Sequence, residues 1–332
     1  MDNFSQFEAV EASGFNENLS AVKSRDRKTL RKLSFLSGTA VILYVFIQNF
    51  IVAALEGAGL IDLYTKNSFF QSGIDILLIL LGVLLPFTLA GKRMQKISGE
   101  VEPVMTEPVK GKALFVFATA GCTGCVMLAN ICSSYITYFI SLLGYELQAP
   151  DIEMPDGAMG FLITMLRVCI LTAVVEEYCL RGHVMGNLRY YGDAFAIVMS
   201  AGIFALMHGN LIQVPFAMLS GMALGMFTVQ SNSIWPAVVA HGINNGLSVI
   251  ISYLIKIVGE ERGMLLYSYA MYALIFIGLV GCFLFAMNSK KTRLRKPCTA
   301  LSLPEKTLTF LLSPPSVIAF LLMVLITAKS VN

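Results

Sequence analysis

Long apolar runs, separated by short polar segments, recur along almost the whole of this 332-residue chain. A helix that crosses the hydrocarbon core of a bilayer needs ~20 predominantly apolar residues. The apolar windows predict eight such spans, at 35–58, 72–91, 113–143, 160–180, 193–209, 211–229, 234–256 and 266–288. The pattern therefore predicts an all-α, polytopic bundle of transmembrane helices.

The C-terminal part of the chain holds one further apolar segment, 307–328, which contains Pro314 and Pro315. A proline inside a helix removes a backbone donor and costs ~3 kcal/mol in a soluble helix, although neighbouring helices can satisfy the freed groups in a membrane. We therefore expect this segment to be kinked or only partly inserted. With it, the number of spans would rise to nine.

The composition agrees with this assignment. Only 14% of the residues are charged, 56% are hydrophobic and the mean hydropathy is +0.71. Soluble globular domains carry about 25% charged residues. The composition thus excludes an ordinary soluble enzyme and predicts an integral, multi-pass membrane protein, with the lipid bilayer as its first partner.

Lysine and arginine gather in three clusters at span ends. The clusters comprise Lys23, Arg25, Arg27, Lys28, Arg31 and Lys32 before the first span, Lys92, Arg93, Lys96, Lys110 and Lys112 after the second, and Lys290, Lys291, Arg293, Arg295 and Lys296 after the eighth. All three fall on one side if the N-terminus is inside, whereas the acidic 145–158 loop falls on the other. The N-terminus is therefore predicted to be cytoplasmic, in a protein of the cell membrane.

The spans divide the chain into four parts: a cytoplasmic tail over 1–32, N-terminal membrane helices over 33–159, a central group over 160–255 and C-terminal helices over 256–332. The start of the tail has no apolar core, so it lacks the pattern of a cleaved signal peptide. The basic clusters are interpreted as topology signals that also contact anionic lipid headgroups, and no nucleic-acid partner is expected.

A few ionisable residues lie inside the predicted spans. The prominent ones are Glu176, Glu177, Arg181, His208 and His241. A charge at the centre of a membrane helix costs ~2.5–3.5 kcal/mol on insertion scales, so such residues are rare and mark functional sites by default. The central group of helices is therefore the expected place of function.

Helical spacing separates the two glutamates. Glu177 and Arg181 are four residues apart, so they face each other across one turn, where their charges offset each other. Glu176 points ~100° away around the helix and becomes a candidate general base if it faces a dry pocket. The alternative, in which both glutamates share Arg181 as a structural ion cluster, stays open on this stretch alone.

A histidine is expected at the depth of Glu176. If spans 160–180 and 193–209 form a hairpin that turns near Tyr191 and Gly192, then Glu176 and His208 lie level on adjacent helices. A Glu facing a His at membrane depth is harder to explain as packing than either residue alone.

His241 has polar neighbours on its own predicted helix. His241 is followed by Asn244 and Asn245, which share its helical face. Imidazole and carboxamide groups donate hydrogen bonds without a permanent charge, which suits the stabilisation of a developing oxyanion.

Three motifs in this region resemble those of a known family. They are Glu176-Glu177-x-x-x-Arg181, Phe204-x-x-x-His208 and His241-x-x-x-Asn245. In order and spacing they are similar to the motifs of the CPBP intramembrane proteases, the Rce1-like type II CAAX prenyl endopeptidases, also called Abi proteins. The resemblance covers the 160–255 part and implies a catalytic core. It implies hydrolysis of a peptide bond in a membrane-anchored protein or peptide, with CAAX-box protein processing as the best-known case.

The resemblance also implies roles for the motif residues. Glu176 and His208 would activate the attacking water, and His241 and Asn245 would form the oxyanion hole.

Three further residues would support these groups. Glu177 and Arg181 correspond to a supporting pair, in agreement with the spacing, and Phe204 is expected to pack against the His208 imidazole.

A metal ion is one alternative, because the family is described both as metal-dependent and as a metal-free glutamate type. Glu176, His208 and His241 would be the ligands of a zinc ion with one open position. The chain has no His-Glu-x-x-His motif, and Asn245 as a fourth polar member fits a base with oxyanion donors. No cofactor is therefore favoured, and zinc stays the alternative.

Other intramembrane proteases fit less well, because the chain lacks the Gly-x-Gly-Asp motif of an aspartyl type. Ser220-Gly221 lacks the preceding glycine of a rhomboid-like serine motif, and Ser220, Gly221, Ala223 and Gly225 instead predict close helix packing. Two functions without catalysis also remain. The polar residues would form an ion relay in a transporter or receptor, or a binding site in a bacteriocin-immunity scaffold.

Overall fold

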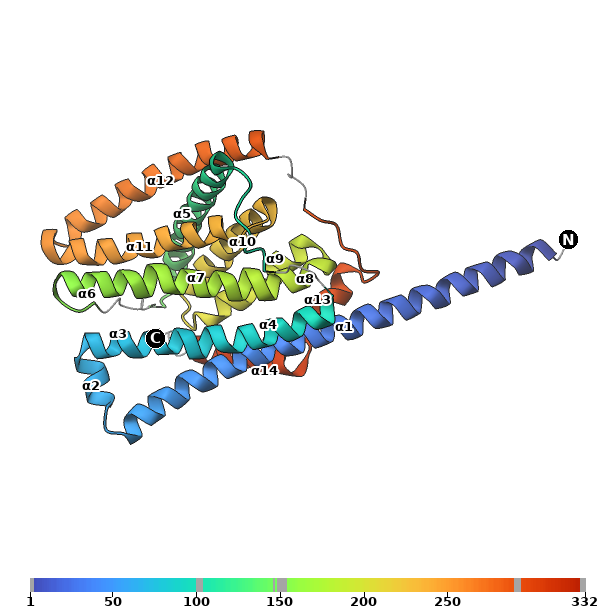
Figure 1. The fold of residues 1–332 in the computed structure, drawn as a ribbon, viewed down its shortest axis with the longest axis horizontal. Helices are drawn as coiled ribbons and strands as arrows, with labels where there is room; N and C mark the ends of the chain where they lie inside the picture. Colours follow the sequence, from blue (N-terminus) through green and yellow to red (C-terminus); the bar gives the residue numbers. More distant parts are fainter. Residues whose placement is uncertain (1–2, 100–103, 146, 148–153, 290–293, 329–332) are drawn as a thin grey trace.

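The computed structural model describes residues 3–99, 104–145, 147, 154–289 and 294–328, and every regular element in these ranges is a helix. The predicted all-α fold class is thereby confirmed. Figure 1 shows most helices gathered in one bundle, with the N-terminal part of the first helix projecting from it.

The helices follow one another with short connections. In chain order the α-helices are α1 (Asn3–Gly57), α2 (Ile61–Lys66), α3 (Ser68–Leu78), α4 (Leu85–Ser98), α5 (Lys112–Leu142), α6 (Gly157–Thr164), α7 (Thr172–Glu176), α8 (Gly186–Leu188), α9 (Asp193–Met207), α10 (Gln213–Ser231), α11 (Trp235–Val258), α12 (Glu260–Asn288), α13 (Leu303–Leu311) and α14 (Pro314–Ala328). Three π-helical segments, η1 (Ile79–Leu84), η2 (Met165–Leu171) and η3 (Glu177–Met185), and the 3-10 turn η4 (Arg189–Tyr191) join some of these into longer rods.

Seven of the described helices or rods are long and apolar enough to cross a membrane. They are Asn18–Gly57, Ser68–Ser98, Lys112–Leu142, Gly157–Tyr191, Gln213–Ser231, Trp235–Val258 and Glu260–Asn288. The proline-containing segment is bent by 71° between α13 and α14, as the prediction of a kink required, and would be an eighth span if the pair counts as one. The chain is thus a multi-pass membrane protein.

The predicted span 193–209 differs from the structure. It corresponds to α9, which has 15 residues. At 1.5 Å per residue such a helix reaches only ~22 Å, less than the ~30 Å of a bilayer core. The chain reverses after His208, where Gly209 has a positive φ of 58°, and returns through α10. The hairpin turn predicted near Tyr191 and Gly192 is present, because η4 ends there and α9 begins.

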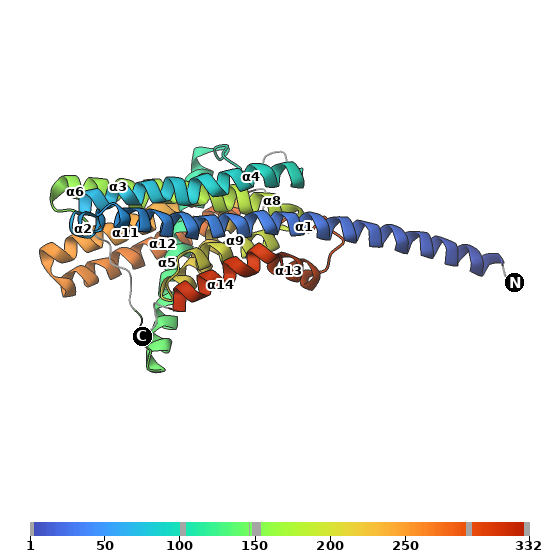
Figure 2. The ribbon, with the colours of Figure 1, turned by 90° about the horizontal axis from the view of Figure 1, so that it is seen from below.

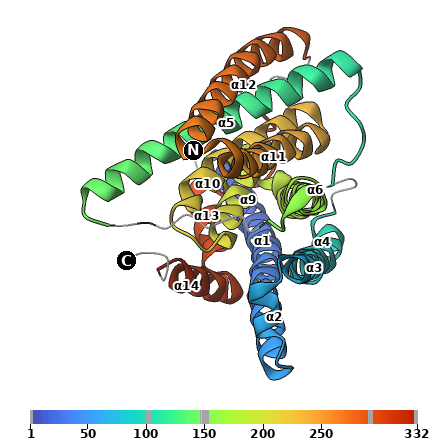
Figure 3. The same cartoon turned by 90° about the vertical axis from the view of Figure 1, so that its left-hand side faces the viewer.

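Close contact between α5 and α12 depends on glycine. Gly124 of α5 faces Gly278 of α12, and a Cβ atom added at Gly278 would lie 2.3 Å from the Gly124 Cα atom. Small residues allow two membrane helices to approach closely and gain van der Waals contact. Figure 3 shows the two helices crossing at the edge of the bundle.

We expect Gly278→Val to force α5 and α12 apart and to lower the melting temperature of the detergent-solubilised protein. Overpacking of a tight contact costs about 1–3 kcal/mol. Gly73→Val is the matched control, because Gly73 lies in α3 and no heavy atom lies within 4 Å of its added Cβ. Equal melting temperatures for the two variants would contradict this account.

The small residues of α10 also pack closely, as predicted. A Cβ atom added at Gly221 would lie 3.1 Å from the Ala201 side chain, and one added at Gly225 would lie 3.2 Å from the Met185 sulfur. Helix α10 therefore lies tightly against α9 and η3, which carry several of the motif residues.

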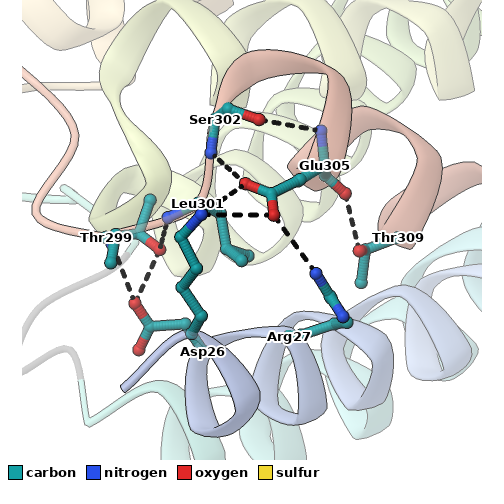
Figure 4. A network of polar contacts seen from close by, with 9 residues as sticks. Asp26, Arg27, Thr299, Leu301, Ser302, Glu305 and Thr309 are labelled. Carbon is teal, nitrogen blue, oxygen red and sulfur yellow. Dashed lines mark hydrogen bonds and ion pairs between the residues drawn. The ribbon is translucent and has the colours of Figure 1, made fainter. Parts of the chain in front are cut away.

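The C-terminal segment returns to the first helix through a polar network (Figure 4). Glu305 lies 3.4 Å from Lys23 Nζ and 3.3 Å from Arg27 Nη2, and it completes a capping box with Ser302 at the start of α13. Asp26 accepts a hydrogen bond of 2.6 Å from the Thr299 hydroxyl. These contacts tie the start of α13 to the middle of α1.

Residues from each of the three basic clusters lie at one end of the bundle. Lys28 and Arg93, from the first two clusters, line the same cleft. The third cluster is joined to this end through Arg295, whose backbone N–H donates to the Asp193 carboxylate. Three residues before Asp193, the Tyr190 hydroxyl donates to Asp26 of α1. Lys290, Lys291 and Arg293 of the third cluster lie outside the described residues, as do Glu146, Asp151 and Glu153 of the acidic loop. The cytoplasmic orientation therefore stays a prediction.

Candidate active site

Glu177 is completely buried and joins two helices. One carboxylate oxygen lies 3.1 Å from Arg181 Nε, and the other accepts a hydrogen bond of 2.9 Å from His241 Nδ1. The spacing predicted the first contact but not the second. Glu177 therefore orients the His241 ring on α11 as well as neutralising Arg181 within η3.

Arg181 is also completely buried, and it lies over an aromatic ring. Its guanidinium carbon is 4.5 Å from the centroid of Phe204, a cation–π contact. The Phe204 ring stands edge-on to His208, at 4.7 Å between centroids, and to His241, at 5.9 Å. Phe204 thus packs against His208 as expected, and it also separates both histidines from the arginine.

Glu176 has different surroundings. It is the last residue of α7, and its side chain is 20% exposed, whereas that of Glu177 is 0% exposed. A titratable neighbour is His241, whose Nε2 lies 3.7 Å from a Glu176 oxygen. The helix changes from α to π between the two glutamates, and π-helical turns occur frequently at functional sites.

His208 lies at the C-terminal end of α9, with Nδ1 2.8 Å from the carbonyl oxygen of Phe204. A carbonyl oxygen only accepts, so Nδ1 carries the hydrogen in this contact. In the neutral ring Nε2 is then left with a free lone pair. His208 is therefore held in the tautomer that can accept a proton or a hydrogen bond at Nε2.

A cavity of about 840 Å³ brings these groups together at membrane depth. Its wall includes Glu176, His208, His241 and Asn245. Hydroxyl and amide groups extend the polar wall along two helices, with Asn130, Ser133 and Thr137 on α5 and Ser248 and Ser252 on α11. A cavity of this polarity between membrane helices can hold water and a peptide segment.

Three carboxamides form a chain along one wall of the cavity. Asn130 Nδ2 donates to Asn244 Oδ1 at 2.9 Å, and Asn244 Nδ2 donates to Asn245 Oδ1 at 3.2 Å. Asn245 Nδ2 donates one hydrogen to the Val168 carbonyl oxygen at 3.0 Å. An amide carries two N–H donors, so Asn245 keeps one for a ligand. The chain fixes which end of the Asn245 amide acts as the donor.

All seven residues singled out from the motifs therefore meet in one place. They are Glu176, Glu177, Arg181, Phe204, His208, His241 and Asn245. Sequence reasoning missed Asn130, which lies on α5, far from the motifs along the chain. A carboxamide inside the apolar window 113–143 was a usable signal, because polar side chains at membrane depth need partners.

The donor set does not fit a metal ion in its present arrangement. Among the described residues, no three His, Cys, Asp or Glu side chains are grouped closely enough to hold one. The Nδ1 atoms of His241 and His208 bond to Glu177 and to a carbonyl oxygen, which leaves Nε2 of each ring as its possible ligand atom. The described groups therefore lack the third close donor that a protein-bound zinc ion needs.

Comparison with known proteins gives one match. Residues 158–247 match the family model described as "Type II CAAX prenyl endopeptidase Rce1-like". This range contains every motif residue of the cavity but not Asn130. No curated protein and no solved structure matches the chain significantly.

Proposed function

Since residues 158–247 form a domain of the Rce1-like type II CAAX prenyl endopeptidase family, whose members are proteases, we propose that the 840 Å³ cavity is where this chain hydrolyses a peptide bond. The substrate is a protein or peptide anchored in the membrane by a lipid or by a helix. One observation carries the proposal: two adjacent carboxylates have different surroundings, since Glu177 is buried between Arg181 and His241 whereas Glu176 lines the cavity, where it can meet a water molecule.

In this mechanism Glu176 takes a proton from a water molecule, with His208 Nε2 accepting the second hydrogen bond that orients the water. The hydroxide attacks the carbonyl carbon, and its electron pair moves to the carbonyl oxygen. The tetrahedral intermediate collapses as the protonated Glu176 returns its proton to the leaving amine. General acid–base catalysis of this kind contributes ~10²–10⁴-fold in rate.

The developing oxyanion would be stabilised by Asn245 and His241. Asn245 offers its second N–H, while His241 offers Nε2–H only if the ring is doubly protonated, because Nδ1 already donates to Glu177. Two carboxylates lie within 3.7 Å of the ring, Glu177 at Nδ1 and Glu176 at Nε2. On this proposal Glu177 is a positioning residue that holds the His241 ring with Nε2 on the side of Glu176.

The test uses purified protein in liposomes with three fluorescent peptides of one sequence: a farnesylated CAAX peptide, its unprenylated form, and a form fused to a transmembrane helix. We expect cleavage of an anchored form and none of the unanchored one, with fragments identified by mass spectrometry. Glu176→Gln is the inactive control. A chelator arm with metal analysis of the active fraction separates the glutamate mechanism from the zinc alternative.

The non-catalytic alternatives predict other results in the same liposomes. An ion relay through Glu176, His208 and His241 would give proton flux under a pH gradient, with no cleavage. An immunity scaffold would give neither. Absence of cleavage for every anchored peptide, together with flux that Glu176→Gln removes, would replace the protease proposal by the relay.

We expect Asn130→Ala to lower kcat by about tenfold with KM unchanged, since the variant loosens the Asn245 amide without removing it. Loss of an oxyanion donor itself costs ~10²–10³-fold. Ser134→Ala is the matched control, because Ser134 lies one turn further on α5, lines the same cavity and bonds only to its own helix. Equal kcat values for the two variants would contradict the role of the amide chain.

A further inference from the structure

A second cleft, of about 580 Å³, lies far from the motif residues along α1 and α4. Its wall carries Lys28, Arg31 and Lys32 on α1 and Arg93 and Lys96 on α4. No acidic residue is part of the wall. Figures 1 and 2 show α1 and α4 side by side, with α14 packed against α1. Two separate chain segments therefore build one concentration of positive charge.

The cleft cations differ from their neighbours on the same helix. Lys23 and Arg27 pair with Glu305, and Arg25 lies 3.7 Å from Asp26, so those charges are neutralised within the protein. None of the five cleft cations forms an ion pair within the described part of the chain. Their charge is left for a partner outside the protein.

Apart from Ser313, the rest of the wall is apolar. Phe35 and Leu36 of α1, Ile97 of α4 and Pro314 at the bend into α14 complete the cleft. Phe35 is 50% exposed and lies one turn past Arg31, where the apolar part of α1 begins. The cleft thus passes from cations to apolar side chains over one or two helical turns, as a membrane–water interface does.

A free anion would need only the cations, whereas an amphiphile needs both parts of this wall. Arginine forms paired hydrogen bonds with phosphate oxygens, and lysine supplies a point charge to the same group. Basic pockets between membrane helices are suited to anionic lipid headgroups, at about 1 kcal/mol per Lys or Arg near the surface.

We propose that this cleft binds one anionic phospholipid, with its phosphate between Arg31 and Arg93 and an acyl chain along Phe35 and Leu36. The bound lipid would hold α1, α4 and the α13–α14 bend together at the membrane interface. The proposal is independent of the hydrolytic site, and its test measures binding rather than cleavage.

The test is native mass spectrometry of the delipidated full-length protein in neutral detergent, titrated with phosphatidylglycerol. We expect one saturable lipid on the unaltered protein and at least about tenfold weaker binding to Arg31→Gln/Arg93→Gln. Lys92→Gln/Lys112→Gln is the matched control, because it removes the same charge from exposed positions outside the cleft and should leave the affinity unchanged. If the first pair does not fold, Lys28→Gln/Lys32→Gln replaces it, with the same expected loss.

Two further arms define what would overturn the proposal. Phosphatidylcholine with the same acyl chains should not saturate the site, and inorganic phosphate should not displace phosphatidylglycerol. Equal weakening in the cleft and control variants would show general surface attraction. Displacement by inorganic phosphate would show a phosphate site in place of a lipid site. Either result, or an affinity unaffected by both cleft variants, overturns the proposal.

Discussion

Glu176→Gln is expected to reduce cleavage of any accepted substrate by at least ~10²-fold while the protein stays folded, because it removes the proposed general base. The two side chains have the same shape. Glu176 is part of the cavity wall, and its carboxylate lies 3.7 Å from His241 Nε2, beyond hydrogen-bond distance, so the substitution breaks no hydrogen bond between these two helices. The measurements are the initial rate in liposomes and the melting temperature of the same preparation.

Glu177→Gln is the matched comparison for this prediction. Glu177 is the next residue in the chain, and the chemical change is the same, but its side chain is fully buried against Arg181 and His241. We expect it to lower both the melting temperature and the rate, since Arg181 and His241 lose their shared anion. The proposal fails if Glu176→Gln retains the rate of the unaltered protein, or if both substitutions affect stability and rate in the same proportion.

Arg181→Met is expected to give the largest loss of stability, about 3–5 kcal/mol, because it leaves the buried Glu177 carboxylate without its cation. Arg181 is 0% exposed, and its guanidinium also packs on Phe204, so the variant loses charge compensation and packing together. Thermal and denaturant unfolding in detergent measure the effect. Arg25→Met is the matched control, because Arg25 is exposed and should change stability little.

A double variant tests the cause of that loss. Replacing both members of a buried ion pair by uncharged groups is often close to neutral. Arg181→Met/Glu177→Gln should therefore be more stable than Arg181→Met alone, and the difference is the coupling energy of the pair. Additive losses in the double variant would show that Arg181 acts through packing on Phe204 alone.

The different surroundings of the two adjacent glutamates are the main chemical feature of the site. Glu177 is held by η3 and α11 together, through Arg181 and His241. Glu176 is turned toward the cavity by one step of the helix. The same dipeptide thus supplies one fully buried carboxylate and one that lines the cavity, which is the arrangement that the proposed hydrolysis requires.

Several features followed from local pattern alone. The run of apolar windows predicted an all-α membrane protein because a spanning helix satisfies its own backbone groups. The four-residue spacing predicted the Glu177–Arg181 pair, because residues four apart in a helix lie next to each other whatever surrounds the helix. The bend at Pro314 is likewise a property of the backbone.

Contacts between distant segments needed the tertiary structure. Asn130 of α5 reaches Asn244 of α11 only because those helices lie side by side, and nothing in the local sequence names the partner. The His241 ring is hydrogen-bonded to Glu177, although the sequence gave no reason to expect Glu177 rather than Glu176 as its partner. The length of α9 is a third case. Its apolar window has the length of a span, but in the structure the helix ends at Met207 and the chain turns back at Gly209.

The sequence by itself therefore determined the class of the protein, the family motifs and the residues that bear charge at membrane depth. Periodicity and spacing act within a turn or two of helix, and those features depend on nothing further away. The tertiary structure alone decided that Glu176 faces a polar cavity, that Glu177 is shared with His241, and that cations from α1 and α4 line one cleft. These depend on how the helices pack, which is set by side chains far apart in the chain, such as Glu177 and His241, which are 64 positions apart.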